Sequence, residues 1–423
     1  FVRLRLPGAK MLRRLMTCFF LLFVFSSTFS IAISQTSLGI CVLFFVAAAI
    51  RERFNPFTHE LRWFWLAVTC YIGWLVIVCL LQDDPLHALN NIREEWLFVI
   101  VPVGLYLMRD RETIDLIATS LAVGLLLISI VALLSYVFRV QYHWGDGFIP
   151  LPETNPRVSG NFSTPLTFGN FAAVGSLVIL SWVFARVKRW AALRITALLG
   201  GVLGLVAVLF CGGRGPALAG MIGLIVLLLL TSRTGRRWGL AVMIAVLLVG
   251  VLTPSVRSRF TTELGYHFNP DWPGSRLFIW GRSLEMVADH PLIGVGPGNF
   301  DLEYKQRLAP DITDRFWYQH AHNDFLEAAA RSGLLGAATF GLLWVAVFGS
   351  LFRRWPRTAE GSPERELLTM SLVGSVVFLA ASMTEATFSD EEVRTILMLV
   401  WALGLSAVYN QKAGVSPAAV TVT

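Results

Sequence analysis

The most chemically suggestive residues of this chain lie in one polar stretch, residues 319–327, at the start of an apolar run. The stretch contains His320 and His322. Asn323 or Asp324 can cap a helix that begins here, which would place the His322 ring at a helix N-terminus. The positive end of the helix dipole disfavours an imidazolium, so His322 is predicted to stay neutral and able to accept a proton. General-base catalysis requires this state; the alternative is a histidine that only caps the helix or bonds a neighbour.

Gln319 and His320 are expected to support His322. Two histidines so close together also suggest a metal site. Zinc needs three or four ligands, however, and no further His or Cys stands at a usual spacing, so no metal is predicted. The five cysteines lie in or at the ends of apolar runs without a CxxC pair, and buried thiols are expected instead of disulfides.

Arginines form the second group of candidates. Arg214 stands in a Gly-Gly-Arg-Gly-Pro hinge between two apolar runs, and a charge so close to membrane depth is a candidate for function. Its alternative is an interfacial residue that snorkels to lipid head groups. Arg157, Arg276 and Arg282 are weaker candidates, because each can be solvated or paired with an acid. Several guanidinium groups facing one cleft would suit a pyrophosphate.

A glycine-rich run and several acidic residues are better explained by structure than by chemistry. Gly294-x-Gly-x-Gly is predicted to form tight turns, because the strand and helix of a dinucleotide-binding unit are missing around it. The carboxylates of Asp83 and Asp84, of Glu385 and of the acids at 390–392 could supply an acid or a cation site at the outer surface, but acidic residues are common in outer loops.

The composition indicates an all-α polytopic membrane protein. Hydrophobic residues make up 55% of the 423 residues, charged ones 15%, and the mean hydropathy is +0.63. A single membrane domain, 1–423, is expected, with about twelve transmembrane helices. They are expected near 15–33, 36–50, 61–81, 96–108, 113–138, 166–185, 193–210, 216–231, 238–253, 333–352, 367–388 and 394–410. The first is predicted to be a membrane helix instead of a cleaved signal peptide.

The long polar segment 254–332 is predicted to lie between the ninth and tenth of these helices. An amphipathic helix is expected over 276–289, where apolar residues recur at helical spacing, and residues 139–165 are expected to be irregular.

The distribution of Lys and Arg predicts the orientation. Alternate gaps between the apolar runs hold basic clusters, and the other gaps, apart from 254–332, hold only isolated arginines. The clusters include Arg51/Arg53/Arg62, Arg233/Arg236/Arg237 and Arg353/Arg354/Arg357. Because positive residues are retained in the cytoplasm, both termini are expected there and 254–332 on the outer face. The net charge of +7 is then explained without nucleic acid, which is not an expected partner.

Several of these residues carry a resemblance. His322-Asn323, nine residues and Gly333-Leu334-Leu335-Gly336 resemble the H-[N/S/Q]-x9-G-x-x-G signature of O-antigen ligases, with Ala337 where the signature prefers Thr or Val. The run from Arg276 through 290–296 is similar to the wider O-antigen ligase/polymerase superfamily.

The resemblance implies a membrane fold of the glycosyltransferase C type. It implies transfer of a polysaccharide from undecaprenyl pyrophosphate to lipid A-core, in the bacterial inner membrane with the active site facing the periplasm. It implies no cofactor, nucleotide sugar or metal. Carried over by position, His322 is the essential histidine, Arg214 and Arg276 are the arginines, and Asp390 is a further match near the last outer loop.

Other functions remain open from the sequence. An O-antigen polymerase or a protein O-oligosaccharyltransferase would use the same donor and differ in the acceptor. A transporter is the alternative from another class, although its usual signs, charges in the middle of spans and matching halves, are not found in the sequence.

Overall fold

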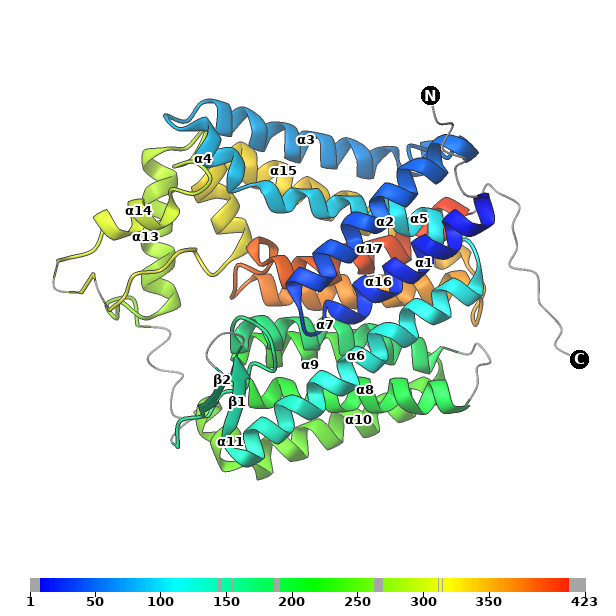
Figure 1. The fold of residues 1–423 in the computed structure, drawn as a ribbon. Helices are drawn as coiled ribbons and strands as arrows, with labels where there is room; N and C mark the ends of the chain where they lie inside the picture. The colour runs from blue at the N-terminus through cyan, green and yellow to red at the C-terminus, as the bar shows by residue number, and fades with distance from the viewer. Residues whose placement is uncertain are drawn as a thin grey trace, which may run out of the picture.

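The computed structural model describes residues 8–143, 147–153, 156–185, 191–261, 269–310, 312–313 and 315–410. Part of the predicted 254–332 segment, residues 262–268 together with 311 and 314, lies outside this description. A helical bundle forms the body of the described chain (Figure 1).

Twelve helices of the bundle overlap the twelve apolar runs predicted from the sequence. They are α1 (Ala9–Ser26), α2 (Ile31–Glu52), α3 (Arg62–Leu80), α5 (Ile100–Leu107), α6 (Arg111–Phe138), α7 (Pro165–Phe184), α8 (Ala191–Phe210), α9 (Arg214–Leu230), α10 (Arg233–Leu252), α15 (Asp324–Arg354), α16 (Pro363–Ser382) and α17 (Glu391–Tyr409). Within the described residues, nine helices are long and apolar enough to cross a membrane. This supports an all-α polytopic membrane protein, but the count of twelve spans is not confirmed.

The three remaining helices differ in charge or length. The 18 residues of α1 include three basic side chains, and α9 has 17 residues. The predicted span 96–108 is α-helical over only eight residues, because a 3-10 helix, η2 (Arg93–Val99), precedes α5. Pro102 has no amide hydrogen and is tolerated only in the first turn of a helix, so the α-helical bonding cannot extend back past Ile100.

Helix α7 lies at the centre of the bundle. It is buried along almost its entire length and packs against α6, α8, α9, α16 and α17. A helix that is apolar all round is expected in this position. Its N-terminus is therefore held firmly at one end of the bundle.

Short elements connect the long helices. They are η1 (His59–Leu61), α4 (Pro85–Asn90), α11 (Pro254–Thr261), α13 (Arg276–Asp289), α14 (Phe300–Gln306), η3 (Trp355–Arg357) and η4 (Thr387–Ser389). The amphipathic helix predicted over 276–289 is present as α13. Its buried residues Ile279 and Met286 share a small core with Phe300 and Tyr304 of α14. In Figure 1, α13 and α14 lie beyond one end of the bundle, while α1 begins and α17 ends at the other.

The prediction of irregular structure over 139–165 was partly wrong. Strands β1 (Val140–His143) and β2 (Gly147–Pro150) form an antiparallel pair, in which Tyr142 faces Phe148. Their rings are in contact, with centroids 5.4 Å apart. Aromatic cross-strand pairs stabilise hairpins, and strands this short, in a segment rich in Gly and Pro, leave little sequence signal.

Helix α15 contains a break at Gly333, where φ is +73°. A Cβ atom at this position would lie 2.0 Å from the Leu292 carbonyl oxygen, so only glycine fits. The break lets the turn at 291–296 dock on α15. The Leu334 amide donates to Pro291 O at 2.9 Å, and the Val295 amide donates to Ala330 O at 2.8 Å. The glycine of the sequence motif therefore joins the 254–332 segment to the bundle.

Candidate functional site

The loop that carries His322 is held by the first turns of α15. Asn323 is the N-cap of the helix, as the sequence suggested, and its Oδ1 accepts two backbone amides at 3.0 Å. The Ala321 amide donates to Glu327 Oε2 at 2.7 Å. His322 itself has a φ of +52°, a left-handed conformation that is unfavourable for residues other than glycine. These bonds offset that cost.

A second loop, between α16 and α17, is tied to the same helix start. Asp324 accepts hydrogen bonds from Thr387 Oγ1 at 2.8 Å and from the Phe388 amide at 3.0 Å. The Asn323 side-chain amide donates to a carbonyl of this loop at 3.1 Å. The loop carries Glu385, which is thereby brought beside His322.

His322 and Glu385 form a buried pair. His322 Nδ1 lies 2.8 Å from Glu385 Oε2, and the two residues are 8% and 7% exposed. The other carboxylate oxygen of Glu385 accepts an ion-paired hydrogen bond from Arg276 Nη2. An ionised carboxylate can only accept, so the histidine proton resides on Nδ1. The lone pair is then on Nε2, which has no hydrogen-bond partner among the described residues.

Burial and neighbouring charges determine the protonation states. Burial lowers the pKa of His322 below 6.5; the bond to Glu385 raises it, and Arg276 lowers it further. Burial and then the His322 charge lower the pKa of His320 to about 4. Burial raises the pKa of Glu385, but the bond from His322 and the charge of Arg276 outweigh it, and the net pKa lies below 4.5. Glu385 is therefore ionised and both histidines are neutral at neutral pH.

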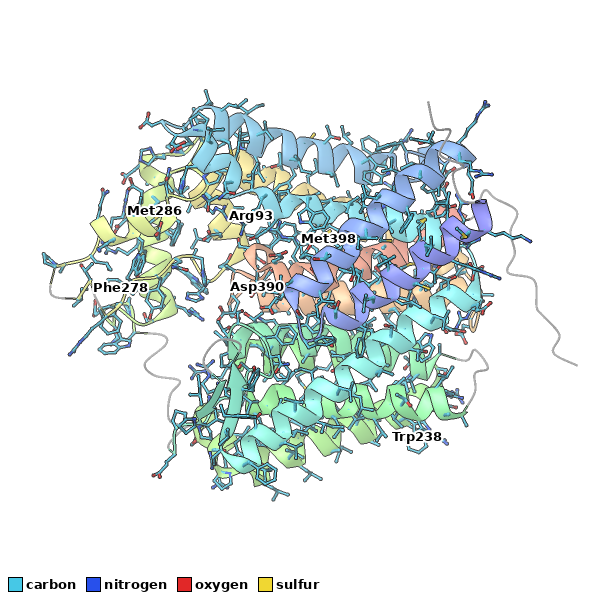
Figure 2. The ribbon with its side chains drawn as sticks, viewed as in Figure 1. Arg93, Trp238, Phe278, Met286, Asp390 and Met398 are labelled. Atoms are coloured by element: carbon cyan, nitrogen blue, oxygen red, sulfur yellow. The ribbon has the colours of Figure 1, made fainter. Side chains whose placement is uncertain are left out.

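A cavity of about 470 Å³ adjoins this pair. Its lining combines histidines, acids, hydroxyl side chains and one arginine, namely His320, His322, Glu385, Asp390, Glu391, Glu392, Ser163, Thr164, Thr167, Asn170 and Arg157. Figure 2 shows Asp390 at the end of the bundle that faces α13, on which Phe278 and Met286 are labelled. Apolar residues, Ile31, Pro165, Leu166 and Ala386, line the rest of the cavity, so it offers both polar groups and apolar surface to a ligand.

Arginines gather beside the cavity at the start of α9. Arg157 lines the cavity and donates from Nε to Cys211 O at 3.0 Å. Arg214 Nη1 donates to Arg259 O at 3.3 Å, and the buried Arg259 guanidinium donates to Gly212 O at 3.0 Å. We call Arg157, Arg214 and Arg259 the arginine group. Arg259 was not singled out from the sequence, because nothing local distinguishes it from other basic residues of the 254–332 segment.

The other predicted site residues lie at varying distances from this centre. Asp390 lines the cavity and accepts from Thr167 Oγ1 at 2.6 Å. Gln319 is exposed and does not line the cavity. Arg282 pairs with Glu285 of its own helix at 2.9 Å and lies over the Phe278 ring. Arg282 would have to leave this pair to reach the cavity.

The structure supplies a third neighbour for the two histidines. One ligand atom each from His320, His322 and Glu385 lies within 4.8 Å of the others, a grouping that could hold a metal ion. The sequence showed no third ligand because Glu385 comes 63 residues after His322. Arg276 already occupies this carboxylate and adds a positive charge, which opposes a cation.

Residues 199–341 match the protein-family model described as O-Antigen ligase. The match supports the O-antigen ligase/polymerase superfamily. No curated protein matches the sequence of the chain.

The O-antigen ligase match begins within α8 and ends within α15. It therefore includes Arg214, Arg276, His322 and Gly333, but not Glu385 or the acids at 390–392. Ligases and polymerases of this superfamily are glycosyltransferase-like enzymes. The partner of His322 thus lies outside the segment that carries the family signal.

Proposed function

We propose that this protein is an O-antigen ligase, which transfers a polysaccharide from undecaprenyl pyrophosphate to a sugar hydroxyl of lipid A-core. The observation that carries the proposal is the His322–Glu385 pair beside a polar cavity. A neutral histidine with a free Nε2 and an ionised partner on Nδ1 is the arrangement of a general base. A glycosyltransferase C type fold is part of the proposal.

In the proposed reaction, His322 Nε2 takes the proton from the acceptor hydroxyl. That oxygen attacks the anomeric carbon and forms the new glycosidic bond, while the bond from this carbon to the pyrophosphate oxygen breaks. Attack from the face opposite the leaving group inverts the configuration. Glu385 holds the ring in the required tautomer and stabilises the imidazolium that forms.

Arginines are proposed to bind the pyrophosphate. Arg157 lines the cavity, and Arg214 belongs to the same arginine group, in which it donates a hydrogen bond to Arg259 O. Guanidinium binds phosphate oxygens bidentately and neutralises the charge that grows on the leaving group. Arg276, which pairs with Glu385, is proposed to act on both the histidine pair and the donor. The leaving group is already activated, so neither a cofactor nor a metal is part of the proposal.

We place the protein in the bacterial inner membrane as one membrane domain. Both termini face the cytoplasm, and the 254–332 segment and the active site face the periplasm. The basic clusters of alternate loops support this orientation. The partners are then the lipid-linked donor, lipid A-core and the surrounding membrane lipids.

A reconstituted transfer assay tests the proposal. Purified protein in detergent, with EDTA, receives a polyprenyl-pyrophosphate glycan and lipid A-core, and a gel reports the lipid that carries the glycan. We expect the glycan on lipid A-core, with the rate about 10² to 10⁴ lower in His322→Ala. His59→Ala is the matched control, because His59 is exposed and far along the chain from the pair.

Each other result selects a different function. Lengthening of the donor glycan would indicate a polymerase, and transfer to added protein would indicate an oligosaccharyltransferase. No transfer to any acceptor, with solute uptake into vesicles, would indicate a transporter. Unchanged transfer in His322→Ala would contradict the general-base role.

A further inference from the structure

One wall of the cavity has no part in the mechanism above. It is formed where the N-termini of α7 and α17 meet, and side chains with hydroxyl, amide and carboxyl groups line the cavity there. Its residues are Ser163, Thr167, Asn170, Asp390, Glu391 and Glu392, which we call the acidic wall.

Asn170 is the most telling residue of the acidic wall. It is only 2% exposed, yet its Oδ1 accepts no hydrogen bond within the described part of the chain. A buried amide oxygen without a partner costs free energy, which a ligand with a hydrogen-bond donor would recover. Since Asn170 lines the cavity, that ligand would lie in it.

Neighbouring side chains hold the acids of the wall in place. Asp390 caps α17 and accepts from Thr167, while Glu392 Oε2 accepts from Ser163 Oγ at 2.7 Å. Each carboxyl group keeps further acceptor capacity, because a carboxylate offers about four lone-pair sites. The wall is therefore preorganised and rich in acceptors.

A cation does not explain the acidic wall. In the described ranges, the acids at 390–392 are not among the groups of three whose ligand atoms lie within 4.8 Å. The pyrophosphate does not explain it either, because these acidic side chains offer an anion no positive charge.

Gly213, the residue before Arg214 of the arginine group, lies against a different side of α7 from Asp390. Thr167 bonds to Asp390, whereas a Cβ atom at Gly213, next to Arg214, would lie 2.7 Å from Leu166 Cδ2. Adjacent positions of a helix point about 100° apart. Asp390 and the segment before Arg214 therefore contact different sides of the α7 N-terminus, while Arg157 lines the cavity together with the acidic wall.

We infer that the acidic wall binds the acceptor sugar and selects neutral or amine-bearing sugars over sugars that carry a carboxylate or phosphate. This inference rests on the proposed function. Sugar hydroxyls and ammonium groups donate to carboxyl and amide oxygens, whereas an anionic substituent adds to the negative charge of the wall. The donor sugar stays with its pyrophosphate on the arginine side.

Acceptors that differ in one group test the inference. Three glycolipids with the same lipid end in glucose, glucosamine or glucuronic acid, and transfer from the polyprenyl-pyrophosphate glycan is measured for each. We expect kcat/KM for the glucuronic acid acceptor to be lower by about tenfold or more. Equal kcat/KM for all three would overturn the inference.

Variants connect the selectivity to the wall. Glu392→Gln keeps an oxygen for Ser163 but removes a charge, and we expect the discrimination against glucuronic acid to shrink by about threefold. Asn170→Ala should raise KM for the glucose acceptor about fivefold with little change in kcat. Asp83→Asn, at an exposed acid away from the cavity, is the matched control. Unchanged discrimination in Glu392→Gln would contradict the assignment.

Binding without turnover separates this inference from the proposed function. The same three glycolipids are titrated into His322→Ala, and the affinities are compared. Weaker binding of the glucuronic acid glycolipid supports the acidic wall even where no transfer occurs, in which case only the proposed function fails. Equal binding of all three, or no binding of any, overturns the inference whatever the transfer assay shows.

Discussion

At the scale of the residue, the chemistry depends on which nitrogen of His322 carries the proton. Glu385 accepts from Nδ1 and is kept ionised by His322 and Arg276. The cavity-lining histidine is therefore neutral, and its Nε2, which has no hydrogen-bond partner in the part of the chain described, is the nitrogen proposed to act as the base. An orienting carboxylate on one nitrogen and a reacting proton on the other is the logic of general-base histidines in hydrolases.

Replacing Glu385 should reduce turnover without removing the protein from the membrane. In Glu385→Gln the amide can still bond to His322, but it cannot stabilise the imidazolium and also permits the wrong tautomer. We expect kcat to fall by about 10² to 10⁴. The measurement is transfer rate at saturating donor and acceptor. Glu360→Gln, in the exposed turn before α16, is the control, and equal rates in both variants would contradict the role of Glu385.

The pH profile of transfer should have its acidic limb below 6.5. His322 acts when unprotonated, and burial lowers its pKa below 6.5, so activity is retained down to that lower pKa and lost as the pH falls through it. Arg276→Lys keeps the positive charge near His322, while Arg276→Ala removes a charge that lowers the pKa of His322. We therefore expect the limb of Arg276→Ala to move to higher pH. A wild-type limb above 6.5 in kcat/KM would contradict this.

At the scale of the element, α15 is both a candidate membrane helix and the element that holds the candidate site, and its break makes this possible. Its first turns hold the His322 loop and the Glu385 loop, and Gly333 lets the 291–296 turn hydrogen-bond to it. His322 and Gly333, which belong to one sequence motif, thus lie at the same junction between α15 and the 254–332 segment.

Alanine at Gly333 should be strongly destabilising. The positive φ costs a residue with a Cβ atom about 1–2 kcal/mol, and the clash with the Leu292 carbonyl adds to it. We expect a lower thermal unfolding midpoint in detergent and reduced transfer. Gly341→Ala, in the same helix with open space around the Cβ position, is the matched control and should match or exceed wild-type stability. Equal midpoints for the two variants would show that the break tolerates a side chain.

At the scale of the whole molecule, the two ends of the described chain lie at the same end of the bundle, as the proposed topology requires. Helix α1 begins and α17 ends at one end of the bundle, and α13 and α14 lie beyond the other (Figure 1). The basic clusters at 51–62 and 353–357 lie at the junctions between consecutive helices, in the helix ends and the segments that join them.

Reporter fusions test the orientation. A fluorescent protein that folds only in the cytoplasm should fluoresce when fused after Asn410, and alkaline phosphatase, which is active only in the periplasm, should be inactive there. A phosphatase fused after Asp289 should be active. Active phosphatase after Asn410 would reverse the proposed topology.

Much of the fold could be predicted from local pattern. The spacing of Leu277, Trp280 and Leu284 identified α13, because the periodicity of an amphipathic helix is contained within a few turns. The hairpin at 140–150 and the short α5 were missed, since cross-strand contacts and a preceding 3-10 turn leave no such period.

The sequence by itself determined the class of the protein and half of its site. Long apolar runs must be helical in lipid, where each backbone group needs a partner within its own segment, and the position of His322 before a capped helix follows from adjacent residues. Only the tertiary structure decided that Glu385 joins His322, that Arg157, Arg214 and Arg259 gather together, and that the Asn170 oxygen has no hydrogen-bond partner among the residues described. These groups come from helices far apart in sequence. The sequence alone does not distinguish a carboxylate that packing buries from one that stays exposed to water.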